Sequence, residues 1–157
     1  MYTKILLGVD GSEESMRAVK KVASLQKKFK SQVVVFHSIE HHMLPKVIPL
    51  TVPLSNTYQY TFPVVDRKEI EKEYEKEGER VLEAAKRILD TELVPFEHRL
   101  VKDIDPEDYI IERVEKENFD LVVVGCKGKH SKVKQFILGT VATKVLNDAP
   151  CDVLIVR

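Results

Sequence analysis

Short aliphatic runs alternate with segments of helical periodicity along most of the chain. The aliphatic runs occupy residues 3–9, 32–39, 96–101, 120–124 and 152–156. Short continuous apolar runs are typical of strands buried on both faces, whereas apolar residues three and four positions apart indicate helices. The order β-α-β-α-β-α-β-α-β follows. It predicts an α/β fold with a doubly wound, five-stranded parallel sheet and helices on both faces.

Local signals mark where the helices begin. Ser12 can cap a helix whose first residues are two glutamates, because acidic side chains suit the positive end of a helix. The Asp-Pro pair at residues 105 and 106 predicts a second start. Further helices are expected over residues 67–89 and from about residue 139. Gly78 inside the former costs about 1 kcal/mol relative to alanine, which a long packed helix can absorb.

Charge and composition limit the function classes. The chain has 25 basic and 25 acidic side chains, so no global field draws it to nucleic acid or to a membrane surface. Its 157 residues suit one domain, residues 1–157. We find no signal-peptide layout and no membrane-spanning run, and Cys126 and Cys151 are too few for a disulfide framework. A cytoplasmic protein is expected.

Residues 40–66 interrupt the alternation. They contain four prolines, which oppose regular structure, together with two tyrosines and a phenylalanine. Aromatic side chains need an apolar contact. We therefore expect an insert-like loop that acts as a mobile cover or a partner surface, not a sixth core element.

Two loops carry the most suggestive chemistry. Residues 8–12 follow the first strand, and residues 125–128 follow the fourth strand and lead to Gly139. In a doubly wound sheet, ligands bind beyond the carboxyl ends of the strands. Glycines let backbone N–H groups approach phosphate oxygens, and a helix N-terminus adds a favourable partial charge. Residues 127–138 hold four lysines and no acid, which at this position indicates an anion site in preference to a merely solvated loop.

Other site types are less favoured. The patterns G-x-x-x-x-G-K-[ST] and G-x-G-x-x-G are both absent. His37, His41 and His42 lack a cysteine or carboxylate constellation, so surface histidines are expected and not a metal site. Cys126 is interpreted as a small buried residue in preference to a reactive thiol. From the residues alone, Asp10 is equally a capping side chain or a ligand contact.

Several segments together resemble the universal stress protein family nearly from end to end. They are VDGS, FHSI, FDLVVVG and the closing APCDVLIVR. Members of that family carry an aspartate after the first strand. They also carry a G-x-x-G motif that is followed, after nine further residues, by Gly-Ser or Gly-Thr. This chain has Gly125 and Gly128, then ten residues, then Gly139-Thr140. The resemblance implies a Rossmann-like, adenine nucleotide alpha hydrolase-like sheet in the order 3-2-1-4-5, with ATP, with or without Mg, as cofactor.

The resemblance also implies a role for each matching residue. Asp10 lies near the adenine, the backbones of Val9 and Ser38 face the base, and Gly125 passes close to the ribose. Lys127 stands where the family often has histidine, and it adds attraction for phosphate. The implied phosphate donors are Gly128, Gly139, Thr140 and Val141.

The residues predict a binding protein more readily than an enzyme. Near the phosphate loop we find only Lys, His, Ser and Thr side chains, and no catalytic set. We expect a nucleotide-gated binding or regulatory module with a protein partner that the sequence does not name. One alternative is a slow ATPase or self-phosphorylating protein, with Ser131 or Thr140 as acceptor. Another is an interaction protein of the same family that binds no ATP, which the extra loop residue favours and the retained glycines oppose.

The last strand predicts an oligomer. Residues 151–156 are aliphatic and are expected at one edge of the sheet, where only Asp152 and Arg157 add charge. Proteins usually cover, charge or pair such an edge. We therefore expect a homodimer that pairs through this strand, and the family resemblance points the same way.

Overall fold

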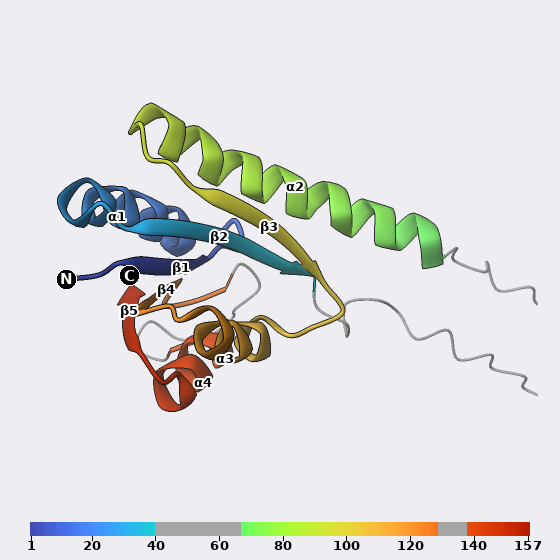
Figure 1. Cartoon of the computed structure of the whole chain (residues 1–157). Helices are drawn as coiled ribbons and strands as arrows, with labels where there is room; N and C mark the ends of the chain where they lie inside the picture. The colour runs from blue at the N-terminus through green and yellow to red at the C-terminus, as the bar shows by residue number, and fades with distance from the viewer. Residues whose placement is uncertain (40–66, 129–137) are drawn as a thin grey trace, which may run out of the picture.

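The computed structural model describes residues 1–39, 67–128 and 138–157 and confirms the predicted α/β fold (Figure 1). Five parallel strands form one sheet in the order β3-β2-β1-β4-β5. The strands are β1 (Lys4–Gly8), β2 (Gln32–Ile39), β3 (Glu97–Lys102), β4 (Leu121–Gly125) and β5 (Asp152–Val156). The helices are α1 (Glu13–Phe29), α2 (Arg67–Thr91), α3 (Pro106–Glu117) and α4 (Thr140–Asp148). Predicted and observed boundaries agree to within one or two residues.

Some expectations lie outside the described residues. These are the cover formed by residues 40–66 and the cationic segment over residues 129–137, which contains Ser131. None of the described helices is long and apolar enough to cross a membrane.

The sheet buries both of its faces because successive side chains on a strand point in opposite directions. On one face, Ile5 and Leu7 of β1 pack with the apolar stripes of α1 and α2. On the other face, Leu6 of β1 and Phe36 of β2 pack with α3 and α4. Figure 1 shows the helices on the two sides of the sheet. The aliphatic runs are therefore continuous, not alternating, as their sequence predicted.

The helix starts follow the capping signals in part. The Ser12 hydroxyl accepts a hydrogen bond from the backbone N–H of Ser15 at 3.1 Å, as expected for an N-cap. Asp105 is the N-cap of α3, but its side chain makes no capping hydrogen bond. Asp105 also lines a cavity at the end of the sheet.

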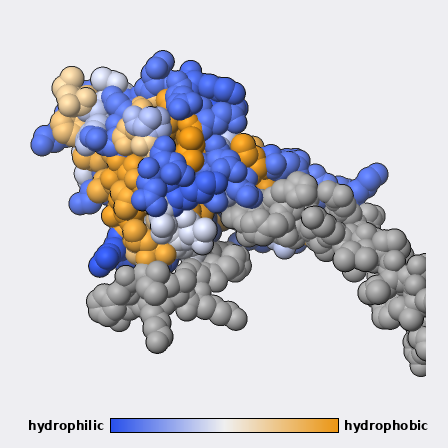
Figure 2. Space-filling view, turned by 90° about the horizontal axis from the view of Figure 1, so that it is seen from below, coloured by the Kyte–Doolittle hydropathy of each residue, from blue (hydrophilic) through white to orange (hydrophobic). Residues whose placement is uncertain are grey.

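The two edges of the sheet differ in chemistry. β3 forms one edge and carries the charged side chains Glu97, Arg99 and Lys102. β5 forms the other edge, and the aliphatic residues 153–156 are only half-buried in the single chain. Figure 2 views the molecule from the side of α4 and β5 and shows apolar side chains gathered on this face.

An ion-pair network ties β3 to the end of α3, away from the carboxyl ends of the strands. Arg99 donates two hydrogen bonds to the Glu117 carboxylate, at 2.6 and 3.0 Å, and a third to Glu97 at 2.7 Å. The Lys4 ammonium donates to the backbone carbonyl of Glu117 at 3.0 Å. The hydrogen bonds from Arg99 hold the pKa of Glu117 below its ordinary value.

Replacing this carboxylate is expected to destabilise the fold. A Glu117→Gln variant should lose about 1.5–3 kcal/mol of unfolding free energy at pH 7, because hydrogen bonds to charged groups are stronger than neutral ones. The pKa of Glu117 is lowered on folding, so its contribution is present above the unfolded value and is lost as the pH falls. Urea unfolding should show a smaller difference in unfolding free energy between variant and parent at pH 3 than at pH 7.

The matched control is Glu83→Gln, since the exposed Glu83 meets Arg87 at 3.8 Å on the surface of α2. It should change the unfolding midpoint far less than Glu117→Gln. Equal effects of the two substitutions would contradict the role given to the network.

Candidate functional site

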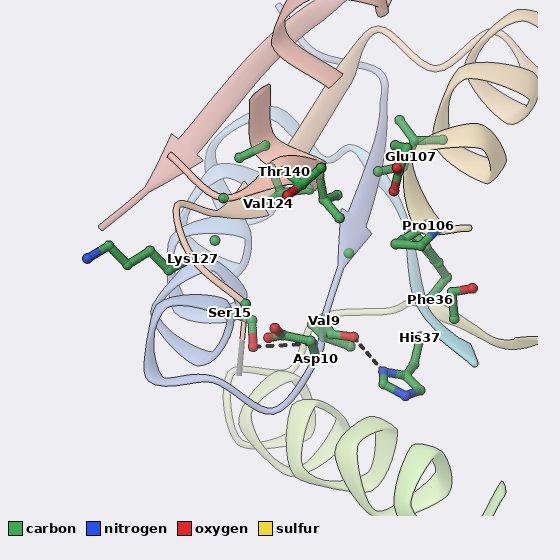
Figure 3. Close-up of a pocket in the computed structure, with 18 of the residues that line it drawn as sticks. Val9, Asp10, Ser15, Phe36, His37, Pro106, Glu107, Val124, Lys127 and Thr140 are labelled. Atoms are coloured by element: carbon green, nitrogen blue, oxygen red, sulfur yellow. Dashed lines mark hydrogen bonds between the residues drawn. The ribbon is translucent and has the colours of Figure 1, made fainter. Parts of the chain in front are cut away.

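A cavity of about 700 Å³ opens at the carboxyl ends of β1, β2 and β4 (Figure 3). Its walls come from the loops after β1 and β4, from the end of β2, from the middle of α2, and from the starts of α3 and α4. The sheet order explains its position, because β1 and β4 are neighbours whose following helices, α1 and α4, lie on opposite faces of the sheet. The volume is in the range of small-molecule sites.

The structure brings together the residues that the sequence analysis assigned to a nucleotide. Every one of them lines this cavity, although they come from four separate stretches of the chain. They are Val9, Asp10, Ser38, Gly125, Lys127, Gly128, Gly139, Thr140 and Val141.

The loop after β1 is held by its own hydrogen bonds. The N–H of Val9 donates to the carbonyl of Phe36 at 3.0 Å and so extends the pairing of β1 with β2 by one residue. Gly11 has a φ of 80°, a left-handed conformation that glycine adopts without strain. Oδ1 of Asp10 accepts from both the N–H and the hydroxyl of Ser12, at 3.0 and 2.6 Å. Asp10 therefore stabilises the turn that starts α1.

The same carboxylate also faces the second loop. A Cβ atom added to Gly128 would lie 3.2 Å from Oδ2 of Asp10. The loops after β1 and β4 therefore meet at this point. Gly128 is exposed, so the space beside it opens to solvent and not into the core.

Gly125 and Gly139 serve the packing of the second loop. A Cβ on Gly125 would lie 3.0 Å from the backbone nitrogen of Ser15, so this glycine lets β4 end against the start of α1. The N–H of Gly139 donates to the carbonyl of Cys126 at 2.8 Å and closes the loop. Cys126 is buried beneath it, as predicted.

The start of α4 supplies backbone donors. Gly139 is its N-cap and offers no side chain to cap the helix. The first N–H groups of a helix have no partner within it, and the helix dipole adds positive potential there. Thr140, Val141 and Ala142 all line the cavity at this end. Lys127 lines it too, but its ammonium group extends away from the cavity (Figure 3). This arrangement suits an anion, because the backbone donors and the positive end of the helix dipole face the cavity.

The opposite end of the cavity is made by β2, α2 and α3. The Ser38 hydroxyl donates to the backbone carbonyl of Ile104, which joins β2 to the loop before α3. Nδ1 of His37 lies 2.7 Å from the carbonyl oxygen of Val9. Tyr74 and Glu77 of α2 complete this wall.

Sequence reasoning missed part of this wall. His37 was expected at the surface with His41 and His42, but its side chain is half-buried and lines the cavity. Its position at the carboxyl end of a buried strand was the signal that could have placed it there. Tyr74 and Glu77 gave no signal, because their place depends on how α2 crosses the sheet. Among the described residues, no group of three or more metal-ligating side chains is found.

The sequence matches the universal stress protein family over residues 1–157. The chain belongs to this family. A universal stress protein of Methanocaldococcus jannaschii is 27% identical over 158 residues, covering 100% of this chain and 83% of the relative. A universal stress protein A homologue of Coxiella burnetii is 29% identical over 160 residues, covering 99% and 96%.

Solved structures of the family share the fold. A universal stress protein of Archaeoglobus fulgidus in complex with dAMP superposes with a TM-score of 0.68 at 20% identity, covering 99% of this chain and 98% of that one. A family protein of Arabidopsis thaliana with AMP bound gives a TM-score of 0.61 at 18% identity, covering 98% and 90%. Both of those proteins bind adenine nucleotides.

Proposed function

We propose that this universal stress protein binds an adenine nucleotide, ATP among them, in the cavity at the carboxyl ends of β1, β2 and β4. The observation that carries the proposal is the convergence of the two glycine loops and the start of α4 on one cavity. Family structures from two other organisms hold AMP and dAMP, which makes adenine nucleotides the first ligands to test.

The phosphates are assigned to the α4 end of the cavity. The amides of Thr140 and Val141 belong to the first turn of α4, where backbone donors and the helix dipole favour an anion. Lys127 lines the same end with its ammonium group extending away from the cavity, so it adds a positive charge nearby and not a direct contact. Gly128 leaves the approach open because it has no side chain. The N–H of Gly139 is used within the loop, so its contribution is to shape the turn.

The base and ribose are assigned to the end formed by β1 and β2. Val9 and Ser38 line this end, and Asp10 lies between it and the phosphate loop. A carboxylate at this boundary accepts hydrogen bonds from ribose hydroxyls or from the exocyclic amine of adenine. Binding at both ends would hold the loops after β1 and β4 together, which is how occupancy would change the surface offered to a partner.

Adding a side chain at residue 128, where the glycine leaves open space, tests the nucleotide site. A Gly128→Val variant is expected to lose AMP and ATP binding by at least tenfold, because a branched side chain would lie against Asp10 and block the phosphate approach. The fold should remain intact because residue 128 is exposed. Isothermal titration calorimetry measures the affinity, and circular dichroism melting measures the fold.

Ser24→Val on the exposed face of α1 is the control for adding a valine far from the cavity. It should leave both measurements unchanged. A folded Gly128→Val variant with the parent's affinity would refute the assignment of the phosphates to this loop.

Slow ATP hydrolysis is a second candidate, favoured by the closeness of Asp10 to the phosphate loop. Fast hydrolysis needs a group that positions water and, as a rule, carboxylates that hold a metal ion. Oδ1 of Asp10 is engaged with Ser12 and serves the turn. A phosphate-release assay should therefore give turnover far below the ordinary enzyme value of about 10 per second. Turnover near that value, abolished by Asp10→Asn, would make this protein an ATPase.

The proposal includes a homodimer that pairs through β5. The aliphatic residues 153–156 form a half-buried sheet edge, whereas the opposite edge at β3 is charged. Two copies related by a twofold axis can pair their β5 strands antiparallel and satisfy both edges at once. Leu154→Pro removes a backbone donor from this strand. It should give a monomer, a less stable protein, or both.

Light scattering at tens of micromolar protein tests the pairing. The parent is expected at twice the mass of the chain. A parent that is monomeric at this concentration would refute the dimer while leaving the nucleotide site untouched.

A further inference from the structure

The peptide unit between Val9 and Asp10 is held on both sides (Figure 3). Its carbonyl oxygen lies 2.7 Å from Nδ1 of His37. Its N–H, which belongs to Asp10, donates to the Ser15 hydroxyl at 3.4 Å. In a trans peptide these two groups point in opposite directions. His37 and Ser15 therefore oppose any rotation of this peptide plane from its two edges.

The hydrogen bond from His37 has a defined direction. A carbonyl oxygen only accepts, so Nδ1 of His37 carries the hydrogen and is the donor. Val9 is 5% exposed, so its carbonyl has little access to water in place of this donor. Losing the donor would leave a buried acceptor without the partner it has here.

The position of the His37 ring is set by α2. A Cβ atom added to Gly78 would lie 2.8 Å from Cδ2 of His37 and 2.6 Å from Cδ1 of Leu100. Real side chains do not approach so closely, so the helix backbone can rest against the imidazole only because residue 78 is glycine. The ring is thereby confined between α2 and the loop after β1.

The contacts of His37 and Ser15 with this peptide fix the position of Asp10. Its Cα atom directly follows the clamped peptide, and its carboxylate lies beside Gly128. A displacement of this peptide would move the Cα atom of Asp10 and with it the carboxylate, which Ser12 holds on the side of the turn. The contacts thus form a continuous path from α2 through His37 and Val9 to Asp10.

We propose that His37 is a positioning residue for nucleotide binding, which acts by holding the Val9–Asp10 peptide so that the Asp10 carboxylate faces Gly128. The inference rests on the proposed nucleotide site and adds to it a residue that the family resemblance did not assign. His37 does not itself contact the ligand in this account.

The first test compares two substitutions at His37. His37→Leu removes the donor and should weaken AMP binding about three- to tenfold, the loss expected for one neutral hydrogen bond. His37→Asn places an amide N–H near the position of Nδ1 and should restore most of the affinity. His98→Asn, at the exposed start of β3, is the matched control and should bind AMP as the parent does.

The second test is a double-mutant cycle with Asp10. If His37 acts through Asp10, adding His37→Leu to Asp10→Ala should weaken AMP binding further by less than about twofold, because coupled residues are not additive. A merely structural role would give the same fold-loss in both backgrounds. Equal losses would overturn the proposal, as would a folded His37→Leu variant that binds AMP like the parent.

A measurement on the unmodified protein covers the case in which the variants fail to fold. Long-range ¹H–¹⁵N spectra of histidine-labelled protein should show His37 in the Nδ1-protonated tautomer. The Nε2-protonated tautomer would overturn the clamp. A parent that binds neither AMP nor ATP would instead overturn the proposed nucleotide site, so the two failures are distinguishable.

Discussion

The burial of both faces of a parallel sheet is the constraint on which the other features depend. Parallel strands need crossover helices, and these helices cover both faces. The side chains of β1 accordingly divide between two cores, with Ile5 and Leu7 on one side and Leu6 on the other. β1 and β4 are neighbours in the sheet, but α1 follows β1 on one face and α4 follows β4 on the other. The cavity is a product of this arrangement, because the two helices leave the carboxyl ends of these strands in different directions.

Much of the fold could be predicted because it is encoded locally. A buried parallel strand needs a continuous aliphatic run, and each of the five runs became a strand. Cap signals such as Ser12 act within a few residues of the helix that they start. Strand order was the exception, because it came from family resemblance and is a property of the whole chain.

The site was predictable only where its residues belong to short motifs. The glycines and Asp10 stand next to strand ends, so their convergence follows from the topology. The reason for each glycine was not predictable, since Gly125 packs against α1 whereas Gly128 faces Asp10. Gly78 was expected to be a tolerated weakness of α2. It is instead a point at which α2 lies close against β2, next to His37, which is about forty positions earlier in the chain.

The charged edge at β3 has a consequence for the size of any assembly. Pairing through β5 would join two sheets into one and leave a copy of β3 at each outer end. Glu97 and Arg99 bond to each other there, and Arg99 also reaches Glu117 of α3. An incoming strand would have to desolvate these ion pairs to extend the sheet. Growth would therefore stop at two chains, and the protein would remain a closed particle instead of a fibre.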